Sequence, residues 1–278
     1  MTKFPLSLFF IFILFVNSCT VTATRAPAVT SIPSAEPSKI STTLTITPLV
    51  SASAQGSTTT APTEEVIASR EVTFETPDGA TITGEVYGSG RTAVVFSVMG
   101  DCNPGWRELA QLTAARGLMT LTYPWRECGP AGPKNEEQLV ANFVNDARGA
   151  INFVRNQGAE NVILAGASLG GIASAKLANE SKANGLIIMA SPPKIPNHDF
   201  TIEASDLDVS IPKLFITAEN DSVVPAAETR KMYEMAAEPK EWQTYPGTSH
   251  GTDLFNTKNG KEVQDRILDF ILTIKKSR

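Results

Sequence analysis

The sequence predicts an α/β fold, in which a mostly parallel sheet carries helices on both of its faces. Two observations predict it. From about Glu65 onward, short runs rich in apolar and β-branched residues alternate with longer runs of helical period. Such alternation of strands with helices favours a parallel sheet that is covered on both sides. The composition agrees, because 42% hydrophobic and 19% charged residues in a chain of 278 suffice for a sizeable core.

The first 18 residues have the features of an export signal. Lys3 supplies one positive charge, and residues 4–16 form an almost unbroken apolar run. A spanning helix needs about 20 apolar residues, whereas a signal peptide needs about 7 to 15, so the run suits a signal peptide. The stretch Val16-Asn17-Ser18-Cys19 resembles a bacterial lipoprotein cleavage box. The resemblance implies a mature protein that starts at a lipid-modified Cys19; the alternative is an ordinary secretory signal with a chance cysteine.

A lipid anchor and a tether would follow the signal. Two or three long acyl chains would hold the protein on the outer face of a bacterial membrane, because each buried methylene contributes about 0.8 kcal/mol. Without lipid the protein would be secreted. Residues 19–64 are dominated by Ser, Thr, Pro and Ala and show no helical or strand period. Such a segment cannot bury enough apolar surface to offset its ordering entropy. We therefore expect a disordered tether over residues 19–64 and one folded domain over residues 65–278.

The folded domain is predicted to open with a hairpin. Its strands, Glu71–Glu75 and Ala80–Tyr87, flank the turn Pro77-Asp78-Gly79. Apolar runs then predict strands at Thr92–Met99, Leu118–Trp125, Asn161–Ala167, Gly185–Ala190, Lys213–Thr217 and Trp242–Tyr245. Helical periodicity predicts helices at Trp106–Ala115, Asn135–Gln157, Ile172–Glu180, Glu228–Ala237 and Lys261–Ile274. Ligands of such a sheet bind at the carboxyl ends of its strands, so the loops at that edge are where a site is expected.

The loop after the strand Asn161–Ala167 carries a nucleophile motif, Gly166-Ala167-Ser168-Leu169-Gly170. A G-x-S-x-G turn from strand to helix is so tight that small residues must flank the serine, which it leaves exposed at the edge of the sheet. Here the motif follows an apolar strand and opens a helix, which is the context that it requires. Ser168 is the predicted nucleophile; the alternative is a glycine-rich turn in which Ser168 only caps the helix.

A serine hydroxyl is a poor nucleophile until a base takes its proton, and the sequence offers two histidines. His250 lies in the loop between the last strand and the last helix. His198 lies in the connection that would cross above the sheet. His250 is the predicted base, because it follows the serine and an acid in the chain order nucleophile, acid, base that is associated with a G-x-S-x-G turn.

The base needs an acid to orient it. Asp221 is the predicted acid, because it closely follows the strand Lys213–Thr217 and a strand end holds a carboxylate in a fixed position. Glu219 is the runner-up, with a solvated loop charge as its alternative role. Asp206 and Asp208 rank lower because they lie outside any predicted strand end.

From about Val72 to the C-terminus the chain resembles α/β-hydrolases of the compact, dienelactone-hydrolase or serine-esterase kind. The segments GASLGG, TAENDSVVP and GTSHG carry the resemblance, in family order. It implies the α/β-hydrolase fold and a triad in which Ser168 is the nucleophile, His250 the base and Asp221 the acid. It also implies an oxyanion hole made by the backbone N–H of Leu169 and an N–H in the loop after the strand Thr92–Met99.

The sequence of that loop departs from the family pattern. Many relatives have His-Gly there, whereas this chain has Met99-Gly100-Asp101. The donor is a main-chain group, so the N–H of Gly100 or of Asp101 can still serve. Losing one such donor costs about 10²- to 10³-fold in rate. A carboxylate at Asp101 would repel the oxyanion unless it points away or is paired.

Two further cysteines, Cys102 and Cys128, follow neighbouring strands of the predicted sheet. An exported protein can keep a disulfide, and two thiols are an even count, so a bridge between them is expected. The alternative is two separate free thiols.

The expected activity is that of a carboxylesterase-like serine hydrolase acting on small or medium acyl substrates outside the membrane. The connection Ser191–Pro212 has only about twenty residues, too few for a separate cap domain, so a fairly open pocket is expected. The triad determines that the reaction is an acyl transfer, but it does not determine the leaving group. A peptidase and an acyltransferase therefore stay open as alternatives. So does a surface binding module that has kept the fold without turnover.

Other chemistry is not expected. Two histidines and two separated cysteines lack the spacing of a metal-ligand set, so neither a metal nor another cofactor is predicted. A net charge of −5, without a local cluster of Lys and Arg, offers no surface to a phosphate backbone. Nucleic acid is therefore not an expected partner, and the oligomeric state is left open.

Overall fold

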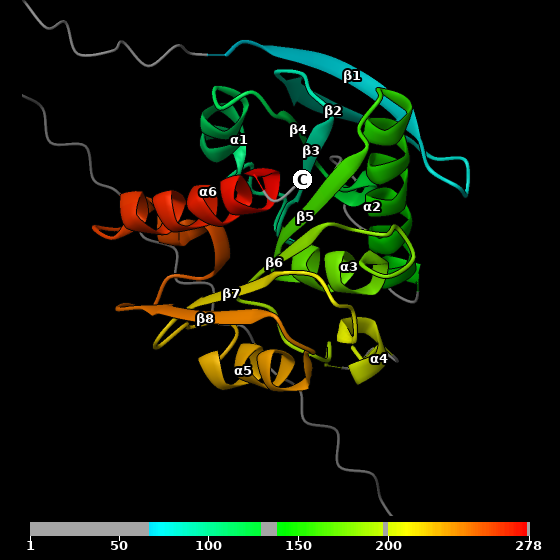
Figure 1. Ribbon diagram of the computed structural model, residues 1–278. Helices are drawn as coiled ribbons and strands as arrows, with labels where there is room; N and C mark the ends of the chain where they lie inside the picture. Colours follow the sequence, from blue (N-terminus) through cyan, green and yellow to red (C-terminus); the bar gives the residue numbers. More distant parts are fainter. Residues whose placement is uncertain (1–66, 129–137, 197–199, 277–278) are drawn as a thin grey trace, which may run out of the picture. The chain divides into compact units, whose positions relative to one another are not determined.

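A computed structural model describes residues 67–128, 138–196 and 200–276 (Figure 1). The described residues all fall in the second of two units of the chain, Thr59–Arg278. The predicted signal peptide, the lipidation residue Cys19, the tether over residues 19–64 and His198 lie outside the described residues. Within the described part, no helix is both long enough and apolar enough to cross a membrane.

The predicted hairpin is confirmed as strands β1, Ser69–Glu75, and β2, Thr81–Tyr87. The two strands pair antiparallel along their whole length. Gly79 closes the turn between them at a φ of 84°, where a residue with a side chain would be strained, and its N–H donates to the Thr76 carbonyl at 2.9 Å. One face of each strand is buried and the other exposed, which is why this hairpin alternates apolar and polar residues.

Six further strands complete one eight-stranded sheet: β3 (Thr92–Ser97), β4 (Met119–Tyr123), β5 (Asn161–Ala167), β6 (Gly185–Met189), β7 (Lys213–Ala218) and β8 (Lys240–Tyr245). The strand order is β1-β2-β4-β3-β5-β6-β7-β8, and β3 to β8 run parallel to one another. The central strands are buried along almost all of their length, so their sequences are predominantly apolar. The predicted, mostly parallel sheet is therefore confirmed.

Helices cover both faces of the sheet, as predicted. They are α1 (Arg107–Ala114), α2 (Leu139–Asn156), α3 (Leu169–Leu177), α4 (Ala204–Leu207), α5 (Ala226–Met235) and α6 (Gly260–Lys276), with the 3₁₀ turns η1 (Arg126–Cys128) and η3 (Gly251–Asn256). Helices α1 and α6 lie on one side of the sheet, and α2 and α3 lie on the other (Figure 1).

The observed helix starts lie within two residues of the predicted ones except at two helices, α3 and α2. Helix α3 begins at Leu169, three residues before the predicted Ile172, because the chain passes directly from strand β5 through Ser168 into the helix. Helix α2 begins at Leu139, and residues 135–137 of its predicted start lie outside the described residues.

The connection between β6 and β7 bears out the expectation that no cap domain is present. Its described residues contain one helical turn, α4, and a single bridge between Lys194 and Thr201. No larger structure covers the carboxyl edge of the sheet from this connection within the described residues.

Candidate active site

Ser168 lies at the carboxyl end of the central strand β5, in a backbone conformation that side chains rarely adopt. Its φ is 53° and its ψ is −120°, a strained combination for a residue with a Cβ. Its N–H donates to the Met189 carbonyl at 2.9 Å, which ties the turn to the neighbouring strand β6. Ser168 is half-buried, so part of the residue remains accessible to solvent.

Glycines make this turn sterically permitted. A Cβ on Gly166 would overlap the backbone of Gly170, and a Cβ on Gly170 would overlap the carbonyls of Ser97 and Val98 at the end of β3. Strand β5, the turn and the end of β3 are packed too closely for any side chain at these positions. The G-x-S-x-G spacing is thus explained by local packing around Ser168.

His250 and Asp221 form a hydrogen-bonded pair. The imidazole Nδ1 lies 2.9 Å from Oδ2 and 3.1 Å from Oδ1 of Asp221. The Asp221 side chain is fully buried, and its Oδ1 also accepts the N–H groups of Val223 and Val224, each at 2.9 Å. Three donors therefore hold the carboxylate where β7 ends. Because Asp221 binds Nδ1 of His250, it does not occupy the other ring nitrogen, Nε2.

The other predicted acids do not meet the imidazole. Glu219 is exposed, and Asp208 is exposed as well. Asp206 instead forms an ion pair with Lys176, whose ammonium donates a hydrogen bond to the carboxylate at 2.6 Å. Of the four carboxylates considered from the sequence, the structure brings only Asp221 to His250.

The loop that bears His250 packs against the Ser168 turn. Gly251, at a φ of 50°, lies so close to Met99 that a Cβ there would overlap its sulfur, and the same Cβ would lie 3.3 Å from the Cβ of Ala167. Gly251 therefore lies close to both Met99 and Ala167. These three residues are the chain neighbours of His250, Gly100 and Ser168. Among the described residues no hydrogen bond joins the imidazole to the Ser168 hydroxyl, a bond that is often long in enzymes without substrate.

The third segment at this edge is the turn Met99–Cys102, which we call the oxyanion turn. The Cys102 N–H donates to the Met99 carbonyl at 3.2 Å and closes it. Gly100 lies against Leu169, since a Cβ on Gly100 would lie 2.6 Å from the Leu169 Cδ1. Leu169 is the first residue of α3, where backbone N–H groups have no intrahelical acceptor. The predicted donor segments are therefore neighbours.

Asp101 is exposed at the top of the oxyanion turn. Its Oδ1 accepts the Asn103 N–H at 3.1 Å, and it forms no ion pair with any residue that the structure describes. The Asn103 amide in turn donates to Asp253 of η3 at 3.0 Å. Asn103 thus links the oxyanion turn to the loop that follows His250.

The expected disulfide between Cys102 and Cys128 is confirmed, with Cα atoms 5.6 Å apart. It joins the oxyanion turn to η1, the segment that follows β4. Two indole N–H groups bind the chain near it: Trp106 donates to the Ser97 carbonyl at the end of β3, and Trp125 donates to the Met99 carbonyl of the oxyanion turn, both at 3.0 Å. No sequence pattern indicates this role for the two tryptophans, because their partners are main-chain atoms of other segments.

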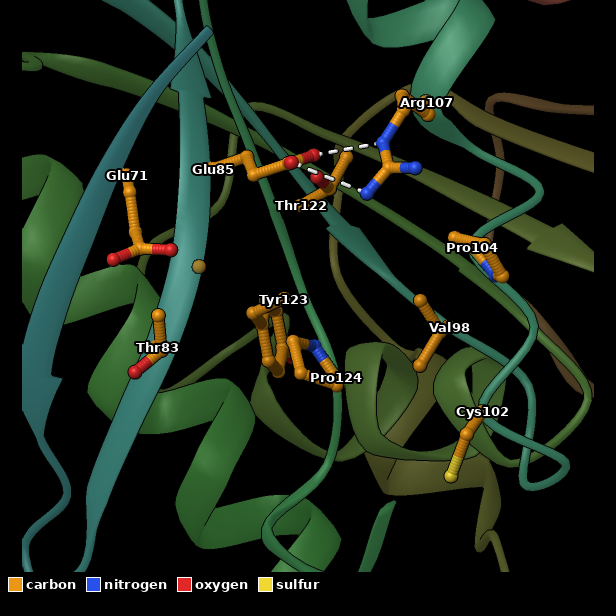
Figure 2. Close-up of a pocket in the computed structure, with 11 residues that line it drawn as sticks. Glu71, Thr83, Glu85, Val98, Cys102, Pro104, Arg107, Thr122, Tyr123 and Pro124 are labelled. Carbon is orange, nitrogen blue, oxygen red and sulfur yellow. Dashed lines mark hydrogen bonds and ion pairs between the residues drawn. The ribbon is translucent and has the colours of Figure 1, made fainter. Parts of the chain in front are cut away.

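A pocket of about 270 Å³ lies beside the site, between the hairpin, β4 and the loop before α1 (Figure 2). Two of its lining residues form an ion pair, in which the guanidinium of Arg107 donates to the Glu85 carboxylate at 2.8 and 3.1 Å. Its lining includes Cys102 and none of the predicted catalytic residues. In the described part of the chain, no group of three or more His, Cys, Asp or Glu side chains is arranged to hold a metal ion.

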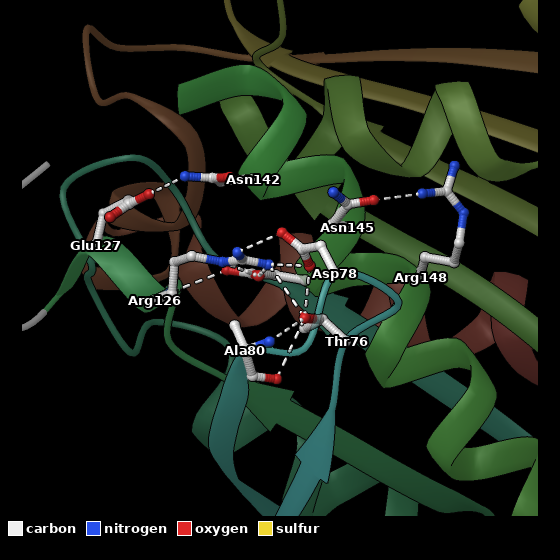
Figure 3. Close-up of polar contacts among 9 residues, drawn as sticks. Thr76, Asp78, Ala80, Arg126, Glu127, Asn142, Asn145 and Arg148 are labelled. Atoms are coloured by element: carbon white, nitrogen blue, oxygen red, sulfur yellow. Dashed lines mark hydrogen bonds and ion pairs between the residues drawn. The ribbon is translucent and has the colours of Figure 1, made fainter. Parts of the chain in front are cut away.

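Arg126 anchors the segment after β4 (Figure 3). Its guanidinium bridges Asp78 in the hairpin turn and Asp146 on α2, at 2.6 Å each. The Asp146 side chain is fully buried, and burial raises its pKa; the Arg126 ion pair holds the pKa of Asp78 well below its usual range. This ion-pair cluster connects three elements around Trp125 and Cys128.

Comparison with known proteins supports the class of fold. A family model described as the alpha/beta hydrolase family matches residues 139–256. The uncharacterized protein YfhR of Escherichia coli K12 is 28% identical over an alignment 154 residues long, which covers 48% of this chain and about half, 54%, of that protein. The uncharacterized protein Rv2307c of Mycobacterium tuberculosis is 26% identical over 230 residues, covering 73% of this chain and 79% of the relative.

Solved structures agree. The Pyrococcus furiosus esterase Pf2001 superposes with a TM-score of 0.62 at 13% identity, covering 74% of this chain and 93% of that one. An alpha-beta serine hydrolase homologue from Coxiella burnetii superposes with a TM-score of 0.58 at 19% identity, covering 72% and 96%. XC6422 from Xanthomonas campestris, described as a serine hydrolase without lid, has a TM-score of 0.57 at 17% identity and coverage of 77% and 96%.

The protein therefore has the α/β-hydrolase fold. Fold and family match together support a hydrolase, and the short β6–β7 connection gives it the form without a large cap.

Proposed function

We propose that the protein is a serine hydrolase that cleaves an ester or related acyl bond through Ser168, His250 and Asp221. The observation that carries the proposal is the hydrogen-bonded pair of His250 and Asp221, at 2.9 Å, whose loop packs against the strained Ser168 turn. Two solved structures of this fold are described as an esterase and as a serine hydrolase homologue, which favours the same chemistry.

The reaction would begin with attack of the Ser168 Oγ on the acyl carbon, while Nε2 of His250 takes the hydroxyl proton. The negative charge that develops on the carbonyl oxygen would be stabilised by the N–H of Leu169 and an N–H of the oxyanion turn. The tetrahedral intermediate would then collapse. The bond to the leaving group breaks, and His250 returns its proton to the leaving alcohol. A water molecule then attacks the acyl-enzyme while His250 takes its proton, and the second tetrahedral intermediate collapses to release the acid and restore the Ser168 hydroxyl.

Asp221 would orient the base and stabilise it when it is protonated. Its carboxylate is held by two backbone N–H groups and is shielded from water, so it fixes the tautomer in which Nδ1 carries the proton. That tautomer presents the lone pair of Nε2 to the serine hydroxyl. The proposed substrates are small or medium acyl compounds, because the described residues build no cap over the edge of the sheet.

We further propose that the protein acts outside the cytoplasm, anchored through a lipid on Cys19. The Cys102–Cys128 disulfide supports export, since such bridges persist in oxidising compartments. Metabolic labelling with a palmitate analogue tests the anchor: label should be incorporated by the wild-type chain and lost in Cys19→Ala. Equal labelling of both would contradict it.

Hydrolysis of p-nitrophenyl esters of increasing chain length by the full-length chain in detergent tests the function. Ser168→Ala should lower the rate at least about 10³-fold, because the nucleophile is removed. Ser249→Ala, which removes a hydroxyl next to His250, is the matched control and should keep most of the activity. Fluorophosphonate should label the wild type and Ser249→Ala, and not Ser168→Ala.

Other outcomes point elsewhere. A protein that labels no faster than its denatured form, and hydrolyses nothing, would be a binding module. More transfer to an added alcohol than to water would indicate an acyltransferase, and activity on peptides alone a peptidase.

A further inference from the structure

We propose that Trp125 is a positioning residue for the oxyanion hole: its indole N–H, together with the Cys102–Cys128 disulfide, sets the orientation of the oxyanion turn. This inference rests on the proposed serine hydrolase function. Such support would allow the segment Met99-Gly100-Asp101, which departs from the family pattern, to present a donor.

The oxyanion turn and the turn Trp125–Cys128 are linked to each other at both of their ends. The oxyanion turn is closed by the Cys102 N–H and the Met99 carbonyl, at 3.2 Å. The turn Trp125–Cys128 is closed in the same way, by the Cys128 N–H and the Trp125 carbonyl, at 2.9 Å. At one end the Trp125 indole donates to the Met99 carbonyl at 3.0 Å, and at the other end the disulfide joins Cys102 to Cys128.

The Met99 carbonyl controls the direction of the adjacent N–H. In a trans peptide, the C=O of one residue and the N–H of the next lie in one plane and point in opposite directions. Because the Met99 oxygen accepts two hydrogen bonds, from Trp125 and Cys102, the N–H of Gly100 is held in a fixed direction. A carbonyl that accepts such bonds also polarises its amide, which makes the N–H a stronger donor.

The donors of the turn are free to meet an oxyanion. Neither the Gly100 N–H nor the Asp101 N–H donates a hydrogen bond to any residue that the structure describes. Gly100 lies against Leu169, whose own N–H begins α3. An orphan N–H on each of two touching segments is the arrangement that an oxyanion hole requires.

Trp125 is held rigidly enough to act as a fixed support. It is 2% exposed. Its ring packs edge-on against Tyr123, with ring centroids 5.4 Å apart, and at a tilt against Phe143 of α2, with ring centroids 4.6 Å apart. The indole therefore cannot follow the oxyanion turn if the turn moves. Its N–H has one position, set by the end of β4 and by α2.

Trp106 provides a matched control. It is also buried, and its indole N–H also donates to a carbonyl at the end of β3, that of Ser97, at 3.0 Å. The peptide that follows Ser97 lies before the oxyanion turn and contains neither proposed donor. Replacing Trp106 by Phe removes the same kind of bond, two residues earlier in the chain, without releasing the Met99 carbonyl.

The test compares Trp125→Phe with Trp106→Phe in the full-length protein. For the best p-nitrophenyl ester, Trp125→Phe should lower kcat about 10- to 100-fold with KM changed less than about 3-fold, since the lost alignment matters only once charge develops. The Ki of a trifluoromethyl ketone, which adds to Ser168 and forms an oxyanion without a leaving group, should rise by the same factor as kcat falls. Trp106→Phe should change both values less than about 3-fold.

Equal losses in the two variants, or a fall in kcat without a rise in the ketone Ki, would overturn the inference. If Trp125→Phe does not fold, the double variant Cys102→Ala, Cys128→Ala tests the same turn, with a parallel fall in kcat and rise in Ki expected. Unchanged values there would also overturn it. Failure of the proposed function is distinguishable, because then the wild type itself would show no activity that depends on Ser168.

Discussion

At the scale of single residues, Asp101 is the group that works against the proposed chemistry. Its carboxylate is next to a proposed oxyanion donor, and its one bond within the described residues, from the Asn103 N–H, leaves the charge in place. The residue is exposed, so water and salt screen it in part. Repulsion of this kind raises the energy of the transition state more than that of the neutral substrate.

Replacing Asp101 by Asn should therefore raise kcat. The Asn side chain keeps an oxygen that can accept the Asn103 N–H, so the turn is preserved while the charge is lost. We expect an increase of about 3- to 10-fold at low ionic strength, shrinking in 0.5 M salt as the charge is screened. Ester hydrolysis at both salt concentrations measures it, with Asp265→Asn on the exposed face of α6 as a charge-matched control. A gain that salt does not change would contradict the electrostatic explanation.

At the scale of elements, the ion-pair cluster of Arg126 connects the hairpin, η1 and α2. Exposed ion pairs contribute little to stability, but here the Arg126 side chain is 17% exposed and that of Asp146 is fully buried. Asp78 is the more exposed partner, at 37% of its side chain. The cluster holds the segment that carries both Trp125 and Cys128, so it supports the oxyanion turn indirectly.

Stability should depend on the charge of Asp78. Arg126 lowers the pKa of this carboxyl, so its stabilisation is fully present above the ordinary value of 3.8 and is lost as the pH falls through the lowered pKa. Asp78→Asn should cost about 0.5 to 1 kcal/mol at pH 7, a value reduced for solvent screening, and progressively less at acid pH.

Urea unfolding at pH 7 and pH 3 measures this effect. Glu160→Gln, which breaks the exposed ion pair with Arg91, is the control and should change the stability little at either pH. A cost for Asp78→Asn that stays constant or grows in acid would rule out the ion pair as its source.

At the scale of the whole molecule, the disulfide is the only covalent connection between distant parts of the described chain. It joins residues 26 positions apart and spans α1 and β4. The cross-link restricts the unfolded chain, so it stabilises the fold as well as the oxyanion turn.

Removing the bridge should be costly. The double variant Cys102→Ala, Cys128→Ala should lower the free energy of unfolding by about 3.5 kcal/mol on the chain-entropy estimate for a loop of this length. Denaturant unfolding of the oxidised wild type and the variant measures the difference, and the reduced wild type should resemble the variant. A reduced wild type as stable as the oxidised protein would disprove a stabilising role.

Much of this protein is predictable from its chain because the signals are local. The period of apolar residues indicated every long helix and strand, and the glycines around Ser168 indicated a tight turn because no side chain fits there. The helix starts were less predictable: α3 begins three residues early, since the turn itself enters the helix.

Contacts between distant segments needed the tertiary structure. Asp221 and Glu219 stand two residues apart, and only the path of the chain after β7 turns Asp221 toward His250. The order β4-β3-β5 brings Trp125 to the Met99 carbonyl and Cys102 to Cys128. Periodicity and steric fit depend on residues close together in the chain, so they can be recognised in the sequence. The contacts of Asp221 with His250, of Trp125 with Met99 and of Cys102 with Cys128 depend on which strands lie side by side, and only the assembled sheet decides that.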